Sequence, residues 1–126
     1  MSNTTSKDEP AHLTQRGVQN PKVIDLIEPR GDSVVLQMIE DRPWSFSKEQ
    51  LQQLGEKFDN YLEYVLAGWF LKHYPQYEGK KICFELLTQT SPHEPAKQML
   101  SDMEEYAKSR GFGFAVREGE TSTALR

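Results

Sequence analysis

Residues 46–75 read FSKEQLQQLGEKFDNYLEYVLAGWFLKHYP, and this stretch decides the fold. Its beginning carries a capping box, because the side chains of Ser47 and Gln50 can each satisfy a backbone N–H that the first helical turn leaves unpaired. Its end is marked by Pro75, because a residue before proline is pushed out of the helical region. We therefore expect one long helix that begins after Ser47 and ends near His73.

Apolar side chains recur at three- and four-residue steps along this stretch. They are Leu51, Leu54, Phe58, Tyr61, Leu62, Val65 and Trp69. At about 100° per residue these side chains share one face of a helix. We expect this stripe to pack against a sheet. Residues 65–71 are apolar all round, but the run is far shorter than the roughly 20 apolar residues that cross a bilayer.

Four further side chains in the last turns point away from this stripe. They are Tyr64, Ala67, Phe70 and Leu71. In one continuous helix they lie roughly 120° to 180° from the stripe, so they cannot all face the same sheet. A contiguous exposed apolar patch usually marks an interaction surface. We predict that these four residues contact another chain, most simply a two-fold copy of the same helix. The alternative is that the loop around Tyr77, or a tail, covers them.

The rest of the chain alternates strand and helix patterns. The expected elements are strands at 23–28 and 34–40, the long helix, a strand at 80–87, a helix from about 91 to 110 and a strand at 112–117. The order ββαβαβ predicts an α+β two-layer sandwich, a four-stranded mixed sheet with two helices on one face.

Residues 1–20 and 118–126 have no apolar period. We expect a disordered leader and tail around a single domain at 21–117.

The composition limits the classes of function that this chain can have. The chain of 126 residues has a formal net charge of -4, which argues against a nucleic-acid partner, since such a partner requires a basic face. The single cysteine, Cys83, cannot form an internal disulfide, so no oxidising compartment is needed. The first residues contain no apolar signal segment. We expect a cytoplasmic protein without a cofactor or membrane contact, whose partner is another protein or a second copy.

Two kinds of catalytic chemistry are weighed against this expectation. Asp25, Asp41 and Glu85 would hold a divalent metal in a small hydrolase or nuclease if they converged in one pocket. Cys83 and His73 would be the nucleophile and base of a thiol enzyme, although a cysteine inside a strand is more often inert. The three histidines have no zinc-ligand spacing.

A binding role is therefore the leading hypothesis, with the chain as a non-catalytic interaction or homodimeric assembly module. An acidic protein that neutralises a basic partner, in the manner of an immunity protein, is a further alternative.

Several unlike motifs occur together at consistent spacing. They are Val23-Ile24-Asp25-Leu26-Ile27, Glu40-Asp41-Arg42-Pro43-Trp44, Gln50-Leu51 with Leu54, Lys57, Tyr61-Leu62, Gly68 and Tyr74-Pro75. This combination resembles a family of small, uncharacterised bacterial domains over roughly residues 21–116. The resemblance implies a bacterial cytosolic origin. It implies no chemistry, because the family has no assigned activity.

Overall fold

Four strands form one mixed sheet in the order β1-β2-β3-β4. The computed structural model describes residues 16–119. The strands are β1 (Leu26–Arg30), β2 (Ser33–Glu40), β3 (Lys81–Thr88) and β4 (Gly113–Glu118). Strand β1 is antiparallel to β2, whereas β2, β3 and β4 are mutually parallel. The predicted α+β class, with a four-stranded mixed sheet, is confirmed.

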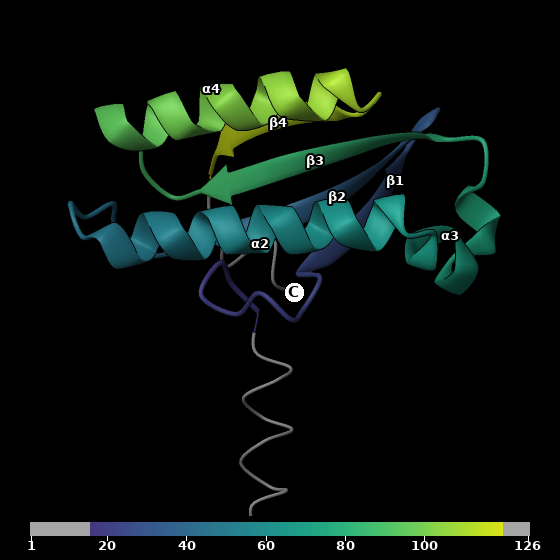
Figure 1. Ribbon diagram of the computed structural model, residues 1–126, viewed down its shortest axis with the longest axis horizontal. Helices are drawn as coiled ribbons and strands as arrows, with labels where there is room; N and C mark the ends of the chain where they lie inside the picture. Colours follow the sequence, from purple (N-terminus) through teal and green to yellow (C-terminus); the bar gives the residue numbers. More distant parts are fainter. Residues whose placement is uncertain (1–15, 120–126) are drawn as a thin grey trace, which may run out of the picture.

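Two helices cover one face of this sheet. Helix α2 (Lys48–Leu66) connects β2 to β3, and α4 (Glu94–Ser109) connects β3 to β4. Each is a crossover between neighbouring parallel strands, and crossovers of one hand place their helices on the same side. Figure 1 shows α2 and α4 side by side and running in the same direction. The core lies between the layers, where Phe58 of α2 packs edge-on against Phe84 of β3 and Phe114 of β4.

The long helix is broken, which corrects the prediction of one helix to His73. Helix α2 ends at Leu66, and Gly68 has a φ of +90°, in the left-handed region that favours glycine. A short helix, α3 (Trp69–His73), follows at a new angle, and a 3-10 turn, η1 (Pro75–Tyr77), comes after it. The break reverses the expected burial of the two aromatic residues that follow. Trp69, expected in the core, is 48% exposed, and Phe70 is fully buried.

The ordered domain begins before Pro21, where the sequence predicted a disordered leader. Val18 is fully buried in the core, and its N–H donates to the Ile39 carbonyl at 2.8 Å. The segment at 16–25 lies along the flank of α2 that faces away from α4 (Figure 1). Strand β1 starts at Leu26 rather than Val23, because the Asp25 N–H donates to the Tyr61 hydroxyl and the Val23 carbonyl accepts from Lys57 Nζ, so these backbone groups pair with side chains. The parts of the predicted leader and tail at 1–15 and 120–126 lie outside the described residues.

Candidate functional site

A fully buried ion pair joins the N-terminal segment to α2. Lys57 Nζ lies 2.8 Å from Asp25 Oδ1, and neither side chain is exposed. The ammonium also donates to the carbonyls of Asn20 at 2.6 Å and Val23 at 2.7 Å. Burial lowers the pKa of Lys57, and the Asp25 carboxylate offsets part of that effect. Three acceptors therefore satisfy the three protons of a lysine that has no contact with water.

The Asp25 carboxylate is equally well satisfied. Besides the lysine, it accepts from the N–H of Gly17 at 2.9 Å and from the N–H of Ile39 at 2.8 Å. The Tyr61 hydroxyl lies beside this pair, accepts from the Asp25 N–H at 2.7 Å and donates to the Gln37 carbonyl at 2.6 Å. Burial, and then the nearby Asp25 charge, raises the pKa of Tyr61 well above its ordinary value. Asp25 therefore holds a backbone segment in place, and neither of its oxygens is exposed to a substrate.

The three acids of the alternative metal site do not converge. Asp25 is buried on the helix side of the sheet against Lys57. Asp41 is exposed in the loop after β2. Glu85 lies on the opposite face of the sheet, in register with Gln37 of β2. Within residues 16–119, no group of three or more histidine, cysteine, aspartate or glutamate side chains could hold a metal ion.

Glu85 belongs to an ion-pair cluster on the outer face of the sheet. Its two oxygens accept from the Arg30 guanidinium at 3.1 and 3.2 Å, and Oε1 also accepts from Gln37 Nε2 at 2.6 Å. Arg117 lies 3.7 Å from the same carboxylate. Burial alone would raise the pKa of Glu85, but these donors outweigh it and lower the pKa below its ordinary value.

Cys83 and His73 do not form a catalytic pair. Cys83 lies half-buried on the outer face of the sheet, where a Cβ on Gly113 would come within 2.8 Å of its sulfur. His73 lies in α3, where its Nδ1 is 2.8 Å from the Tyr64 hydroxyl and its ring stacks on Trp69. Each side chain is held by different neighbours.

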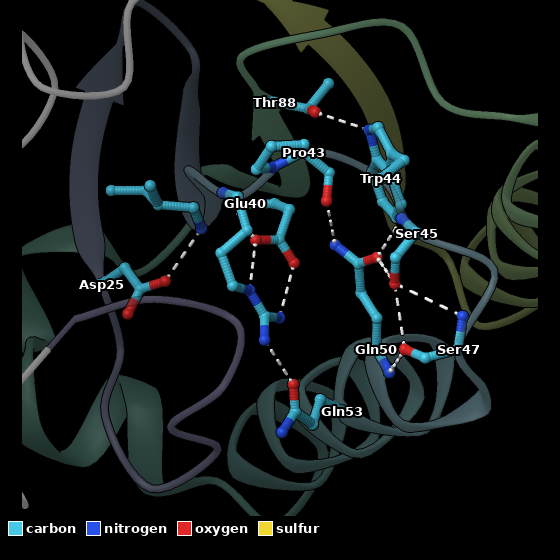
Figure 2. Close-up of polar contacts among 11 residues, drawn as sticks. Asp25, Glu40, Pro43, Trp44, Ser45, Ser47, Gln50, Gln53 and Thr88 are labelled. Atoms are coloured by element: carbon cyan, nitrogen blue, oxygen red, sulfur yellow. Dashed lines mark hydrogen bonds and ion pairs between the residues drawn. The ribbon is translucent and has the colours of Figure 1, made fainter.

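The loop between β2 and α2 is braced by its own side chains, as Figure 2 shows. The buried Glu40 carboxylate accepts from Arg42 Nε at 2.8 Å and Nη2 at 2.7 Å, and Arg42 Nη1 donates to Gln53 of α2. Trp44 Nε1 donates to Thr88 Oγ1 at 2.9 Å, which ties the loop to the end of β3. These side chains satisfy one another's hydrogen bonds, so their role is to hold the loop in place.

The predicted interface residues are divided by the helix break. Phe70 is fully buried and stacks on Tyr77 within its own chain, so it cannot contact a partner. Tyr64 is half-buried, with its ring edge-on to Phe70. Ala67 and Leu71 are exposed. Two of the four predicted residues therefore remain available on the surface around the break, together with Trp69.

A groove of about 580 Å³ runs between α2 and α4 on the side away from the sheet. Its apolar lining comes from both helices, and we call it the α2–α4 groove. Its lining residues are Gly55, Phe58, Asp59, Leu62, Glu63 and Leu66 of α2 with Met99, Asp102, Met103 and Tyr106 of α4. Leu66 is 44% and Tyr106 50% exposed, whereas Phe58 and Leu62 form a nearly buried floor. Gly55 allows the Met99 side chain to approach α2 closely, because a Cβ at this position would meet the Met99 methyl at 2.9 Å.

Every charged side chain that lines this groove is acidic. Asp59 and Glu63 stand on α2 and Asp102 on α4, and all three are exposed. None of the three forms an ion pair with another residue in the part of the chain that the structure describes. Asp102 accepts one hydrogen bond, from Gln98 at 3.2 Å. The α2–α4 groove therefore combines an apolar floor with a rim of unneutralised negative charge.

A family model matches residues 16–120, and its description is a family of unknown function (DUF6572). The chain belongs to this family. No curated protein and no solved structure matches it. The matched range begins with the segment that Asp25 holds and extends through β4. The family therefore covers the whole domain that the structure describes.

Inside the DUF6572 domain, several of the motifs that carried the resemblance have a structural task. Asp25, Lys57 and Tyr61 form the buried network, Glu40 and Arg42 brace a loop, and Gly68 sets the helix break. Within the described residues, the structure contains no helix both long and apolar enough to span a membrane.

Sequence reasoning missed both the buried lysine and the groove, yet the sequence carries a signal for each. Lys57 falls on the apolar stripe, three residues after Leu54 and four before Tyr61, where a lysine needs a buried partner. Asp59 and Glu63 are like charges four residues apart on a helix, an arrangement that costs roughly 0.2–0.5 kcal/mol. The pair is the sequence signal for an acidic surface on this side of α2.

Proposed function

We propose that this DUF6572 domain is a protein-interaction module that binds a partner through the α2–α4 groove. The observation that carries the proposal is an apolar groove that stays open to solvent, although its lining residues would bury favourably against another chain. The polar clusters elsewhere support the proposal indirectly, because Asp25, Glu40 and Glu85 are each engaged by neighbours of the same chain. The proposal places the protein in the bacterial cytoplasm, in keeping with a single unpaired Cys83.

Site-specific crosslinking in the cells that make the protein tests this proposal. A photoreactive phenylalanine analogue placed at Tyr106 should yield a discrete adduct with one partner, since Tyr106 lines the groove. The same analogue at Gln76, an exposed position in η1, is the control. The partner is then identified, purified and tested for binding in vitro.

Two leucine variants assign the binding surface. Leu66→Glu places a charge in the α2–α4 groove and should reduce partner binding at least tenfold, which corresponds to about 1.4 kcal/mol. Leu71→Glu changes a similarly exposed leucine (37% against 44% for Leu66) that lies outside the groove, and it should leave binding unchanged. Equal binding by wild type and Leu66→Glu would rule out the groove as the docking surface. Circular dichroism checks that both variants fold.

Homodimerisation around the helix break is a second candidate function. Trp69 and Leu71 remain exposed there beside Ala67, as an interface between copies would require. Light scattering at high protein concentration distinguishes the two candidates. A dimer that Leu71→Glu dissociates and Leu66→Glu does not would favour the break over the groove.

A further inference from the structure

The α2–α4 groove specifies the chemistry of what binds in it. Resting on the proposed function, we infer that the occupant is an amphipathic helix with apolar side chains along one face and lysine or arginine along both flanks. The apolar face lies on Phe58, Leu62 and Met103, and the basic flanks meet the acidic rim.

The rim supplies the charge complementarity. Asp59 and Glu63 stand on one side of the apolar floor and Asp102 on the other. Their carboxylates are exposed and have no basic neighbour among the described residues that line the groove, so the rim is negatively charged. A cation on each flank of a bound helix would pair with these carboxylates. Rim charges of this kind select partners and accelerate encounter more than they add affinity.

The shape of the groove favours a helix over an extended strand. Its α2 wall runs from Gly55 to Leu66, about 17 Å or three turns at 1.5 Å per residue. Both walls are helices, so most of their backbone groups are already paired and offer no edge for strand addition. A third helix in a groove between two helices presents its anchors at i, i+3/i+4 and i+7, a span of about two turns that fits within the three turns of wall. Met99 and Met103 are flexible and adapt to the anchor side chains.

A second copy of the chain is a poor occupant. A two-fold pairing groove to groove would bring Asp59, Glu63 and Asp102 against the same three residues of the other copy. The chain as a whole carries a net charge of -4, which adds to that repulsion. The partner that the groove fits is therefore a different, basic segment.

Designed peptides test the inference on the full chain. The probe is a labelled peptide of about 15 residues with leucine at helical spacing and lysine elsewhere, long enough to populate a helix. Matched peptides replace every lysine by glutamate, or scramble the order so that no apolar face exists. We expect the basic amphipathic peptide to bind and to shift the amide resonances of Leu66 and Tyr106. Its affinity should fall as the salt concentration rises. The acidic and scrambled peptides should bind at least tenfold more weakly.

Two triple variants, each of which removes three negative charges, show whether the rim carboxylates or the net charge of the chain attract the peptide. Asp59→Asn/Glu63→Gln/Asp102→Asn neutralises the rim and should lower the affinity for the basic peptide about tenfold at low salt. Asp32→Asn/Glu56→Gln/Glu78→Gln removes three exposed charges that lie outside the groove and should change binding less than twofold. Equal losses in the two variants would mean that net charge alone attracts the peptide, and would overturn the inference.

The remaining outcomes separate this inference from the proposed function. Equal binding of the acidic and basic amphipathic peptides would overturn the charge preference and leave the groove as a docking surface. If no peptide bound while the Tyr106 crosslink still captured a partner that Leu66→Glu releases, the helical occupant would be wrong and the interaction function would stand. A dimer that Leu66→Glu dissociates would make a second copy the occupant, against the inference.

Discussion

Lys57 and Asp25 form an ion pair in which neither side chain reaches solvent, with Nζ 2.8 Å from Oδ1. The two residues lie 32 positions apart in the chain. One comes from α2 and the other from the segment that precedes β1, so the pair fixes the position of that segment on the helix. This relationship, together with the buried Val18, explains why the segment at 16–25 is part of the folded domain.

Removing the lysine should destabilise the domain strongly. Lys57→Met leaves the Asp25 charge buried and the carbonyls of Asn20 and Val23 without their donor, which should lower the free energy of unfolding by about 3–5 kcal/mol. Lys48→Met, at an exposed position of the same helix, should change it by less than about 0.5 kcal/mol. Urea denaturation measures both. Equal stability of the two variants would show that the ion pair is not structural.

The segment before Pro21 should contribute to stability. A chain that begins at Arg16 keeps the buried Val18, whereas a chain that begins at Pro21 loses it along with the Gly17 hydrogen bond to Asp25. Burying a valine is worth about 1.5–3 kcal/mol, so the shorter chain should unfold at clearly lower urea concentration. Val18→Ala in the full chain is the milder comparison. Coincident unfolding curves for the two truncated chains would place the domain boundary at Pro21 after all.

Two neighbouring residues of α3 should respond differently to truncation. Phe70→Ala opens a cavity in the core and should cost about 3–5 kcal/mol. Leu71→Ala removes a partly exposed side chain and should cost less than about 1 kcal/mol in the monomer. Thermal unfolding followed by circular dichroism gives both values. The reverse order would restore a continuous helix with Phe70 on its outer side.

An alanine in place of Gly68 at the break should destabilise the domain more than an alanine in place of Gly55 inside α2. Gly68→Ala forces an alanine to a φ of +90° and should destabilise the domain by about 1–2 kcal/mol. Gly55→Ala gains roughly 1 kcal/mol of helix propensity, offset by displacing the flexible Met99 methyl, so its net change should be small. Matched unfolding curves test the contrast. A stabilised Gly68→Ala variant would mean that the helix continues through the break.

Acid should weaken the domain partly through Glu85. Its pKa in the folded state lies below the ordinary value of 4.5, so the folded domain holds that proton less tightly than the unfolded chain. The resulting stabilisation is complete above the unfolded pKa and is lost as the pH falls through the folded pKa. Glu85→Gln should therefore show a shallower decline of unfolding free energy between roughly pH 6 and pH 3 than wild type. Parallel profiles would exclude Glu85 as a contributor.

The sequence alone determined the order and type of the main elements, apart from the break that divides the long helix at Gly68. Ser47 accepts from the Gln50 N–H at the start of α2, which is one of the two bonds of the predicted capping box, whereas the Gln50 side chain accepts from the Ser45 N–H rather than from that of Ser47. The alternation along 34–40 and 82–87 predicted strands that the sheet contains. These features depend on neighbours within four residues along the chain, so the local pattern carries nearly all the information they need.

Tertiary structure decided which side chains end up buried, paired or exposed. One glycine at a φ of +90° rotated the last turn, so Phe70 moved into the core and Trp69 moved out. The acids at Asp25 and Glu85 were separated onto opposite faces of the sheet and paired with cations from distant segments. The α2–α4 groove exists only because two helices from separate crossovers pack side by side. Such arrangements arise from contacts between residues far apart in the chain, and periodicity within one segment carries no record of what a distant segment places beside it.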